Sequence, residues 1–209
     1  MSEDLVRLSK QGAVGVITVD NPPVNALSPG VPEGILNGVQ TFNADAAVKA
    51  IVLIGAGGKF IAGADIRFFG KARAKLPMRP QDALEQSGKP VVAAIAGFAL
   101  GGGYEMALGC HYRVALASAR VGLPEITLGL LPGGGGTQRL PRLIGPAKAL
   151  DLVTSGRHVP APEALELGMI NAVFPANADL LAEAVTYAEG VADTRPIPRI
   201  RDMGDKLAE

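Results

Sequence analysis

The stretch "GFALGGGYEMALGC", from Gly97 to Cys110, is the most informative part of this sequence. Three consecutive glycines stand before a glutamate, Glu105, and apolar residues flank them on both sides. A glycine inside a helix or strand costs about 1 kcal/mol relative to alanine. We therefore expect the run where a Cβ atom would block the backbone, or where a ligand comes very close to it.

A buried strand is predicted before the glycines and a helix after them. The segments "KPVVAAIAG" (89–97) and "KAIVLIGAG" (49–57) are continuously apolar. Such runs are typical of strands buried on both faces of a parallel sheet. The helix is expected to start near Gly102. Because strands alternate with helices along the chain, the sequence predicts an α/β fold.

Weaker patterns predict the remaining elements. Further strands are expected at 12–20, 112–118 and 170–175, and further helices at 32–43, 146–155, 162–167 and 179–191. Residues 123–143 are predicted to be a loop rich in proline and glycine that leads into a short helix. The last stretch, 193–209, is charged and lacks periodicity. We expect one domain over residues 1–192 and a linker or tail over 193–209.

The composition excludes several classes of protein. Of the 209 residues 48% are hydrophobic, and 20 basic residues balance 20 acidic ones. The sequence has no basic stripe of the kind that binds nucleic acid. No apolar run reaches the roughly 18 residues that a membrane span needs. No signal peptide is recognised, and the single cysteine, Cys110, fits a reducing compartment. We expect a soluble cytoplasmic protein without nucleic-acid or membrane partners.

The glycine runs do not fit the known phosphate loops. From Gly97 the glycines have neither the spacing of a dinucleotide fingerprint nor that of a P-loop, and no Gly-x-Ser-x-Gly elbow occurs. With two histidines and one cysteine, a zinc site has too few ligands. After these exclusions, a site built from backbone N–H groups remains. The first N–H groups of a helix lack intrahelical partners, so Gly102 could donate to a developing oxyanion, with Glu105 on the same helix face.

From residue 21 to residue 174 the sequence resembles the crotonase superfamily, the enoyl-CoA hydratases and isomerases. The resemblance is carried, in the family's order, by "NPPVNALS", "FIAGADI", "KPVVAAIAGFALGGGYEMALGCHYRVA", "GLPEITLGLLPGGGGTQRLPRLIG" and "ALELGMINAVF". The pairing of "LGGGYE" with "LPEITLGLLPGGGGTQRLPR" is highly specific. The resemblance implies a crotonase-like ββα superhelix, with a CoA thioester held between its layers.

The resemblance also implies roles for particular residues. Ala64 of "AGAD" and Gly102 match the two oxyanion-hole amides, and Glu105 and Glu125 match the paired catalytic glutamates of hydratases. Hydration of trans-2-enoyl-CoA to 3-hydroxyacyl-CoA, a step of fatty-acid β-oxidation, is the expected activity. Two carboxylates can share one water, so we expect Glu105 to activate it and Glu125 to supply the α-proton.

The resemblance assigns CoA binding to two backbone segments. The pantetheine and adenine portions are expected to lie along Ala62, Asp65 and Ile66, together with Val24 and Ala26 of an earlier loop. An acyl-CoA thioester is thus the expected partner. No metal or organic cofactor is expected, because CoA is part of the substrate.

The chain also departs from the single-domain hydratases, which continue with helices that cap the pocket and help form trimers. The "HYRVA" and "TRPIPRIRD" segments look more like the N-terminal hydratase part of a bifunctional hydratase/3-hydroxyacyl-CoA dehydrogenase. We therefore expect a fragment of a multifunctional enzyme, whose absent part would bind NAD. A homo-oligomer is possible. Two alternatives stay open: a Δ3,Δ2-enoyl-CoA isomerase, and a truncated, inert acyl-CoA-binding module.

Several residues have simpler interpretations. Asp65 could merely cap a turn, and the glycines at 133–136 could be a permissive turn or could face the pocket. The basic cluster of Arg139, Arg142 and Lys148 is expected to form a solvated face, with CoA phosphates as a weaker alternative. Cys110 is expected to be buried. His111 and His158 are expected to form structural hydrogen bonds.

Overall fold

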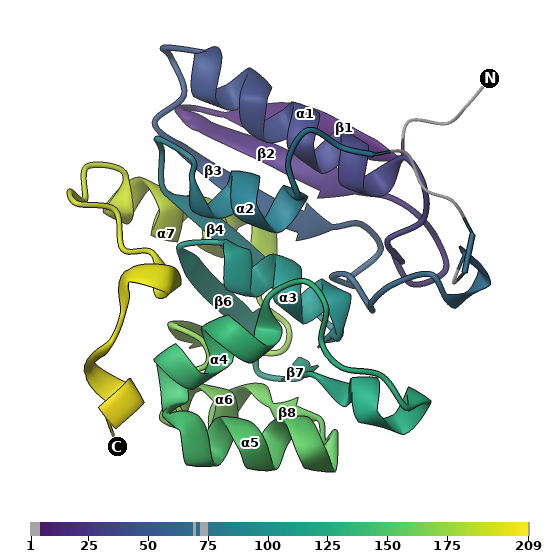
Figure 1. The fold of residues 1–209 in the computed structure, drawn as a ribbon. Coiled ribbons are helices and arrows are strands. Elements are labelled where there is room, and N and C mark those ends of the chain that lie inside the picture. The colour runs from purple at the N-terminus through teal and green to yellow at the C-terminus, as the bar shows by residue number, and fades with distance from the viewer. Residues whose placement is uncertain (1–4, 69, 72–74, 209) are drawn as a thin grey trace.

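The computed structural model describes residues 5–68, 70–71 and 75–208 (Figure 1). Two sheets form the framework. The larger sheet has the order β1-β2-β3-β4-β6-β9, and the smaller one has the order β5-β7-β8. The larger sheet consists of β1 (Val6–Gln11), β2 (Val14–Val19), β3 (Ala50–Gly55), β4 (Val91–Ile95), β6 (Tyr112–Leu116) and β9 (Ala172–Phe174). The smaller sheet consists of β5 (Phe98–Leu100), β7 (Arg120–Gly122) and β8 (Val159–Pro160).

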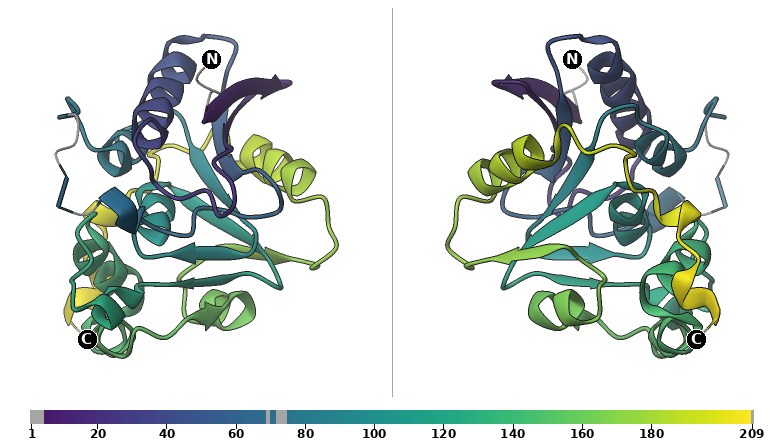
Figure 2. Two further views of the ribbon diagram at one scale, coloured as in Figure 1. Left: turned by 90° about the vertical axis from the view of Figure 1, so that its right-hand side faces the viewer. Right: turned by 90° about the vertical axis from the view of Figure 1, so that its left-hand side faces the viewer.

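Helices cover both faces of the larger sheet. In order, the helices are α1 (Val31–Ala44), α2 (Pro80–Glu85), α3 (Gly102–Gly109), α4 (Gly136–Ile144), α5 (Pro146–Ser155), α6 (Ala161–Glu166) and α7 (Leu180–Val191). Figure 2 shows α1 and α7 on opposite sides of the larger sheet. All neighbouring strands in that sheet are parallel except β1 and β2. The predicted α/β class is confirmed.

Side-chain alternation along the central strands builds two hydrophobic cores. On β3, Ile51 and Leu53 join the core that includes residues of α1 and α3, whereas Ala50 and Val52 join the core against α7. Because successive side chains of a strand point to opposite faces, one continuously apolar strand serves both cores. This is the physical basis of the uninterrupted apolar runs in the sequence.

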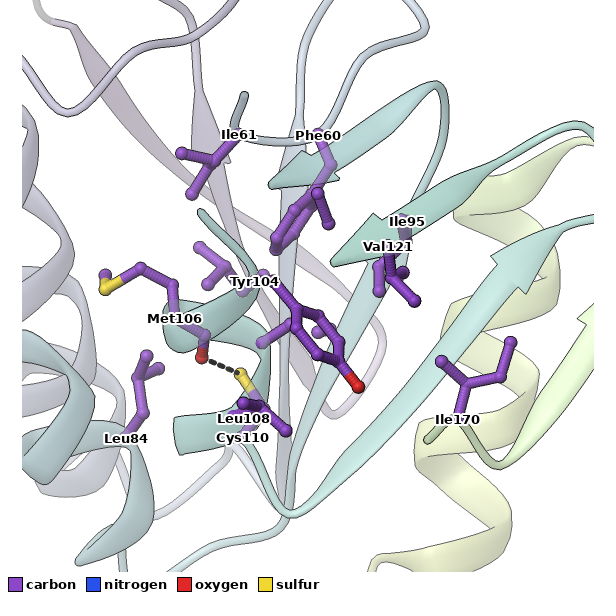
Figure 3. Close-up of a cluster of buried hydrophobic side chains, with 14 of the residues drawn as sticks. Phe60, Ile61, Leu84, Ile95, Tyr104, Met106, Leu108, Cys110, Val121 and Ile170 are labelled. Atoms are coloured by element: carbon purple, nitrogen blue, oxygen red, sulfur yellow. Dashed lines mark hydrogen bonds between the residues drawn. The ribbon is translucent and has the colours of Figure 1, made fainter. Parts of the chain in front are cut away.

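Helix α3 is buried on every side, which explains the apolar residues that follow the glycines. Figure 3 shows Tyr104, Met106 and Leu108 of this helix among the surrounding core side chains. Each of these three residues is at most 1% exposed. The hydroxyl of Tyr104 donates to the carbonyl of Met169 at 3.2 Å. At the far end of α3 the buried Arg113 donates to the carbonyls of Ala107 and Cys110, where a positive charge complements the helix dipole.

Four short or exposed strands were not predicted from the sequence, the two-residue β8 among them. All but the first residue of β1, "VRLSKQ", are exposed, so the strand lacks the apolar alternation that marks a half-buried strand. Strands β5 and β7 have three residues each, too few to show a period. Both nevertheless position the site, because β5 leads directly into the glycine run.

The stretch expected to be a linker or tail packs against the rest of the chain. Short 3-10 helices span Ile200–Asp202 and Asp205–Ala208, next to α4. Ile200 is 1% exposed and belongs to the larger core. The domain boundary at residue 192 itself stays a prediction. Among the described residues, no helix has the length and apolar character to cross a membrane.

Candidate active site

Two backbone amides meet at the start of α3. Ala64 lies in the long connection after β3, and Gly102 is the first residue of the helix. A Cβ added to Gly102 would lie 3.6 Å from the Ala64 nitrogen and 3.2 Å from Cδ1 of Leu27. Within the described part of the chain, neither N–H donates a hydrogen bond outside the regular elements. Both amides therefore lie close together without an acceptor among the described residues, and the oxyanion-hole role that the resemblance implies for Ala64 and Gly102 stays a prediction.

Each of the three glycines has its own reason to be there. Gly101 has φ +51°, a left-handed conformation that suits glycine. A side chain on Gly102 would crowd Leu27 and the amide of Ala64. At Gly103 a Cβ would lie 1.8 Å from the carbonyl oxygen of Ile61, which is closer than any real contact. The run thus brings α3 against the segment that contains Ala64.

Glu105 lies under this site and is held by a second glycine run. It is 3% exposed. Its Oε1 accepts hydrogen bonds from the amides of Gly134 and Gly136 at 2.7 and 2.8 Å. Gly136 begins α4, so the carboxylate faces the positive end of that helix. Oε2 makes no hydrogen bond to the residues that the structure describes, which leaves it free to bind a water.

Glu125 lies against the first glycine run, on a 3-10 helix that spans Pro124–Leu128. A Cβ added to Gly101 would lie 3.1 Å from Oε1 of Glu125. The buried Oε2 of Glu125 has no hydrogen-bond partner in the described part of the chain. Burial, together with the nearby charge of Glu105, raises the pKa of Glu125 from its ordinary 4.5 to about 7. A carboxyl group with this pKa can give or take a proton near neutral pH.

These groups surround a cavity of about 230 Å³. It is lined by Ala62, Gly63, Ala64, Ile66, Leu100, Gly101, Gly102, Pro124, Glu125, Thr127, Leu128 and Leu130. Two backbone amides and one carboxyl group with a raised pKa therefore share an otherwise mainly apolar space. Glu105 is not part of the lining, although it lies three residues after Gly102 on the same helix.

The residues expected to hold CoA divide into two groups. Ala62 and Ile66 line the cavity, and Ile66 is 63% exposed. Val24 and Ala26 do not line it, although the carbonyl of Val24 accepts a hydrogen bond from the amide of Ala62 at 3.2 Å. CoA binding by any of these residues stays a prediction.

The side chain of Asp65 has a structural role. It accepts hydrogen bonds from the Ser28 hydroxyl at 2.7 Å and from the guanidinium of Arg67 at 2.8 and 2.9 Å. It also accepts one from the Arg67 amide, which makes it a cap for the turn after Ala64. The Arg67 guanidinium holds the pKa of Asp65 well below its usual range. This agrees with the simpler of the two interpretations of Asp65.

Part of the site was not predicted from the sequence, and the prediction for one residue was wrong. The role of residues 133–136 was open between two interpretations, and the structure shows that two of these glycines donate to Glu105. The signal was available, since glycines before a predicted helix had already pointed to Gly102. Arg139 was expected on a solvated face but is only 5% exposed. Its burial depends on ion pairs with α2 that no local pattern reveals.

Cys110 and His111 are structural, as expected. Cys110 is buried in the larger core. Nδ1 of His111 accepts a hydrogen bond from the Val91 amide at 2.9 Å, and Nε2 lies 3.2 Å from the Glu85 carbonyl. Burial lowers the pKa of His111 to about 4, so the ring is neutral at physiological pH. The described residues contain no cluster of three or more His, Cys, Asp or Glu side chains that could hold a metal.

Comparison with known proteins identifies relatives over nearly the whole chain. Residues 9–201 match the family described as enoyl-CoA hydratase/isomerase. The human peroxisomal bifunctional enzyme is 53% identical over 94% of this chain, but the match covers 28% of that protein. A probable enoyl-CoA hydratase from Bacillus subtilis is 39% identical, with 91% and 77% covered. The crystal structure of the enoyl-CoA hydratase EchA1 from Mycobacterium marinum superposes with a TM-score of 0.86 at 33% identity, covering 93% and 78%. The chain thus spans about a quarter of the length of the bifunctional relatives it matches.

Proposed function

Because this chain belongs to the enoyl-CoA hydratase/isomerase family, we propose that it adds water across the double bond of a trans-2-enoyl-CoA thioester. The product is a 3-hydroxyacyl-CoA. One observation carries this proposal: among the described residues, a buried carboxyl oxygen of Glu125 has no hydrogen-bond partner, the pKa of this group is about 7, and two amides without an acceptor lie in the same cavity. These are the groups that protonation of a thioester enolate requires.

The oxyanion site supplies the electrostatic part of the reaction. Attack of water on the β-carbon moves negative charge onto the thioester oxygen. The amides of Ala64 and Gly102 would donate to that oxygen, with the dipole of α3 behind them. Loss of one such donor costs about 2.7–4 kcal/mol of transition-state stabilisation in other enzymes.

The two glutamates divide the proton transfers. Glu105 takes one proton from the water, whose oxygen forms the new bond to the β-carbon. Glu125 gives its proton to the α-carbon, so that the double bond is consumed and the charge on the thioester oxygen is removed. The substrate gains one water in all, and a later proton exchange restores both carboxyl groups. Neither transfer requires a metal or an organic cofactor, and CoA enters only as part of the substrate.

The wider setting of the enzyme is also a proposal. Since the human relative is named a bifunctional enzyme, we propose that this chain acts as the acyl-CoA domain of a longer protein whose further part is an NAD-dependent dehydrogenase. Homo-oligomer formation and a cytoplasmic location stay predictions. Peroxisomal relatives make a peroxisomal location the competing expectation, which imaging of the tagged protein in cells would decide.

Hydration of crotonyl-CoA, followed by the loss of enoyl thioester absorbance, tests the proposed function. We expect turnover by the chain, and a decrease of kcat by roughly 10²- to 10⁴-fold in Glu105→Gln and in Glu125→Gln. Glu189→Gln, an exposed position on α7, is the matched control and should keep full activity. A 3-enoyl-CoA substrate measures isomerase activity in the same preparations.

Three other outcomes would contradict the proposal. If CoA raises the melting temperature but no thioester turns over, the chain is an acyl-CoA-binding module and no hydratase. If CoA neither binds nor reacts, the function is wrong for this chain. Turnover of the 3-enoyl substrate alone, lost in Glu125→Gln, would make the chain an isomerase.

A further inference from the structure

A buried ion pair lies directly behind the glycines that hold Glu105. Arg139 projects from α4 and is 5% exposed, and Glu85 at the end of α2 is 1% exposed. Nε and Nη2 of Arg139 donate to the two carboxylate oxygens of Glu85 at 3.0 and 2.8 Å. Nη2 also donates to Asp82 at 3.1 Å. The bidentate geometry fixes the plane of the guanidinium group.

The third nitrogen of the same guanidinium reaches the glycine loop. Nη1 of Arg139 donates to the carbonyl of Gly134 at 3.1 Å. The amide of Gly134 in turn donates to Oε1 of Glu105 at 2.7 Å. One hydrogen-bonded chain therefore runs from Glu85 through Arg139 and Gly134 to the carboxylate of Glu105. It joins α4 to α2 across 54 positions of sequence, and the loop before α4 to α3 across 29 positions.

The glycine loop requires such a support. A Cβ added to Gly134 would lie 2.6 Å from Oε2 of Glu105 and 2.7 Å from Nε2 of Gln81. The backbone of Gly134 is thus pressed closely against the carboxylate. A loop of four glycines has little conformational preference of its own. Its amides can hold Glu105 in one place only if something outside the loop fixes them.

Stability alone is a weak reason for the ion pair. Desolvation of two charges offsets most of their attraction, and apolar residues of similar volume often stabilise such a site as well or better. We propose that Arg139, held by Glu85, is a positioning residue: it fixes the Gly134–Gly136 loop and thereby aims Glu105 at the reacting water. The expected effect on kcat rests on the proposed function. The expected effect on the Gly134–Gly136 loop does not depend on that function.

Four variants separate positioning from folding. Arg139→Lys keeps the charge but cannot contact Glu85 and the Gly134 carbonyl with one rigid fork. Arg139→Gln leaves Glu85 buried with its main partner removed, and we expect it to lose stability. In the double variant Arg139→Gln with Glu85→Gln neither charge remains, so stability should largely return. Arg142→Gln is the matched control on the same helix, because Arg142 bonds only the carbonyl of Gln138 among the described residues.

Two measurements are made on each variant that folds. The first is kcat and KM for crotonyl-CoA. For Arg139→Lys and for the double variant we expect kcat to fall roughly 10- to 100-fold with KM changed less than about twofold, because a displaced base impairs chemistry more than binding. The second is amide hydrogen exchange by NMR, in which the Gly134 and Gly136 N–H groups should exchange faster than in the parent chain. Arg142→Gln should match the parent in both.

The outcomes are distinct. If Arg139→Lys and the double variant keep the parent kcat and the parent exchange rates, Arg139 only tethers α4 to α2 and the inference is overturned. If the parent chain shows no turnover, the proposed function fails, and the exchange rates alone decide whether Arg139 fixes the loop. Recovery of stability without recovery of kcat in the double variant supports positioning.

Discussion

At the scale of single residues, Glu125 shows a conflict between stability and chemistry. Its buried Oε2 lacks a partner in the described part of the chain, and the negative charge of Glu105 acts on it. Both conditions disfavour an ionised carboxylate in the folded protein. A fold selected for stability alone would pair this oxygen or replace the residue. An acid that must hold a proton near pH 7 requires the opposite arrangement.

The sign of this effect gives a prediction. The pKa of Glu125 is about 7 in the folded chain against an ordinary value of 4.5. Stability from the protonated side chain is therefore fully present below the unfolded pKa and is lost as the pH rises through about 7. The side chain in Glu125→Gln cannot ionise, so the stability of this variant relative to the parent should increase as the pH rises from 5 to 8. After allowance for partial exposure we expect on the order of 1 kcal/mol, or roughly 2–4 °C in Tm.

Calorimetric melting at both pH values measures this difference, and Glu189→Gln, on the exposed side of α7, serves as the control. A difference in Tm between Glu125→Gln and the parent that is the same at pH 5 and pH 8 would refute the raised pKa. It would also remove the main support for Glu125 as the proton donor.

At the scale of elements, α3 carries the site because it passes through the core. Its first residue, Gly102, supplies an amide, its fourth, Glu105, supplies a carboxylate, and buried side chains fix its position. The close contact between Gly103 and the Ile61 carbonyl keeps the helix start beside Ala64. The proposed oxyanion site therefore depends on two segments in contact and not on the helix alone.

This contact predicts a strong response to one methyl group. In Gly103→Ala the new Cβ would lie 1.8 Å from the Ile61 carbonyl oxygen, so α3 or its neighbour must move. We expect a loss of about 1–3 kcal/mol in unfolding free energy, measured by urea denaturation. Gly190→Ala in α7 is the matched control, because a Cβ at this position would meet no described atom within 4 Å outside the nearby backbone of its own helix. That variant should gain about 0.5–1 kcal/mol from helix propensity. Equal effects at both positions would refute the close contact.

At the scale of the whole molecule, four separate segments build the site: three contribute to the lining of the cavity, and the fourth binds the carboxylate of Glu105. They contain Ala64, Gly102 with Glu105, Glu125, and the glycines at 133–136. The connections that follow β3 and β4 bring the first two together, at the carboxyl end of parallel neighbours. The ion pair of Arg139 with Glu85 then ties α4 to α2. The chain after α7 returns to α4, where Arg201 lies 3.3 Å from the same Glu85 carboxylate.

The return of the chain can be tested at Ile200. This side chain is 1% exposed, and its removal would leave a cavity in the larger core. Ile200→Ala should therefore lose about 2–5 kcal/mol in unfolding free energy, measured with urea. Leu207→Ala is the matched control in the same segment. Leu207 is 40% exposed, so its truncation should cost less than about 1 kcal/mol. A loss at Ile200 no larger than at Leu207 would mean that the segment does not dock on α4.

The sequence alone determined the elements whose signal is local. Continuous apolar runs identified β3 and β4, and the glycines before Glu105 indicated an amide site at a helix start, because backbone conformation and side-chain period are written into neighbouring residues. The resemblance added the pairing of Glu105 with Glu125. Their catalytic roles stay predictions.

Only the tertiary structure decided how the site is supported. Burial of Arg139, its ion pair with Glu85, and the hydrogen bonds from Gly134 and Gly136 to Glu105 join segments 29 to 54 positions apart. No local sequence pattern predicts such pairs, because the residues around an arginine on an amphipathic helix do not show whether its side chain contacts water or a carboxylate. What distinguishes the two cases is the packing of α2 beside α3 and α4. That packing depends on the whole core at once, and it determines which charges are removed from water.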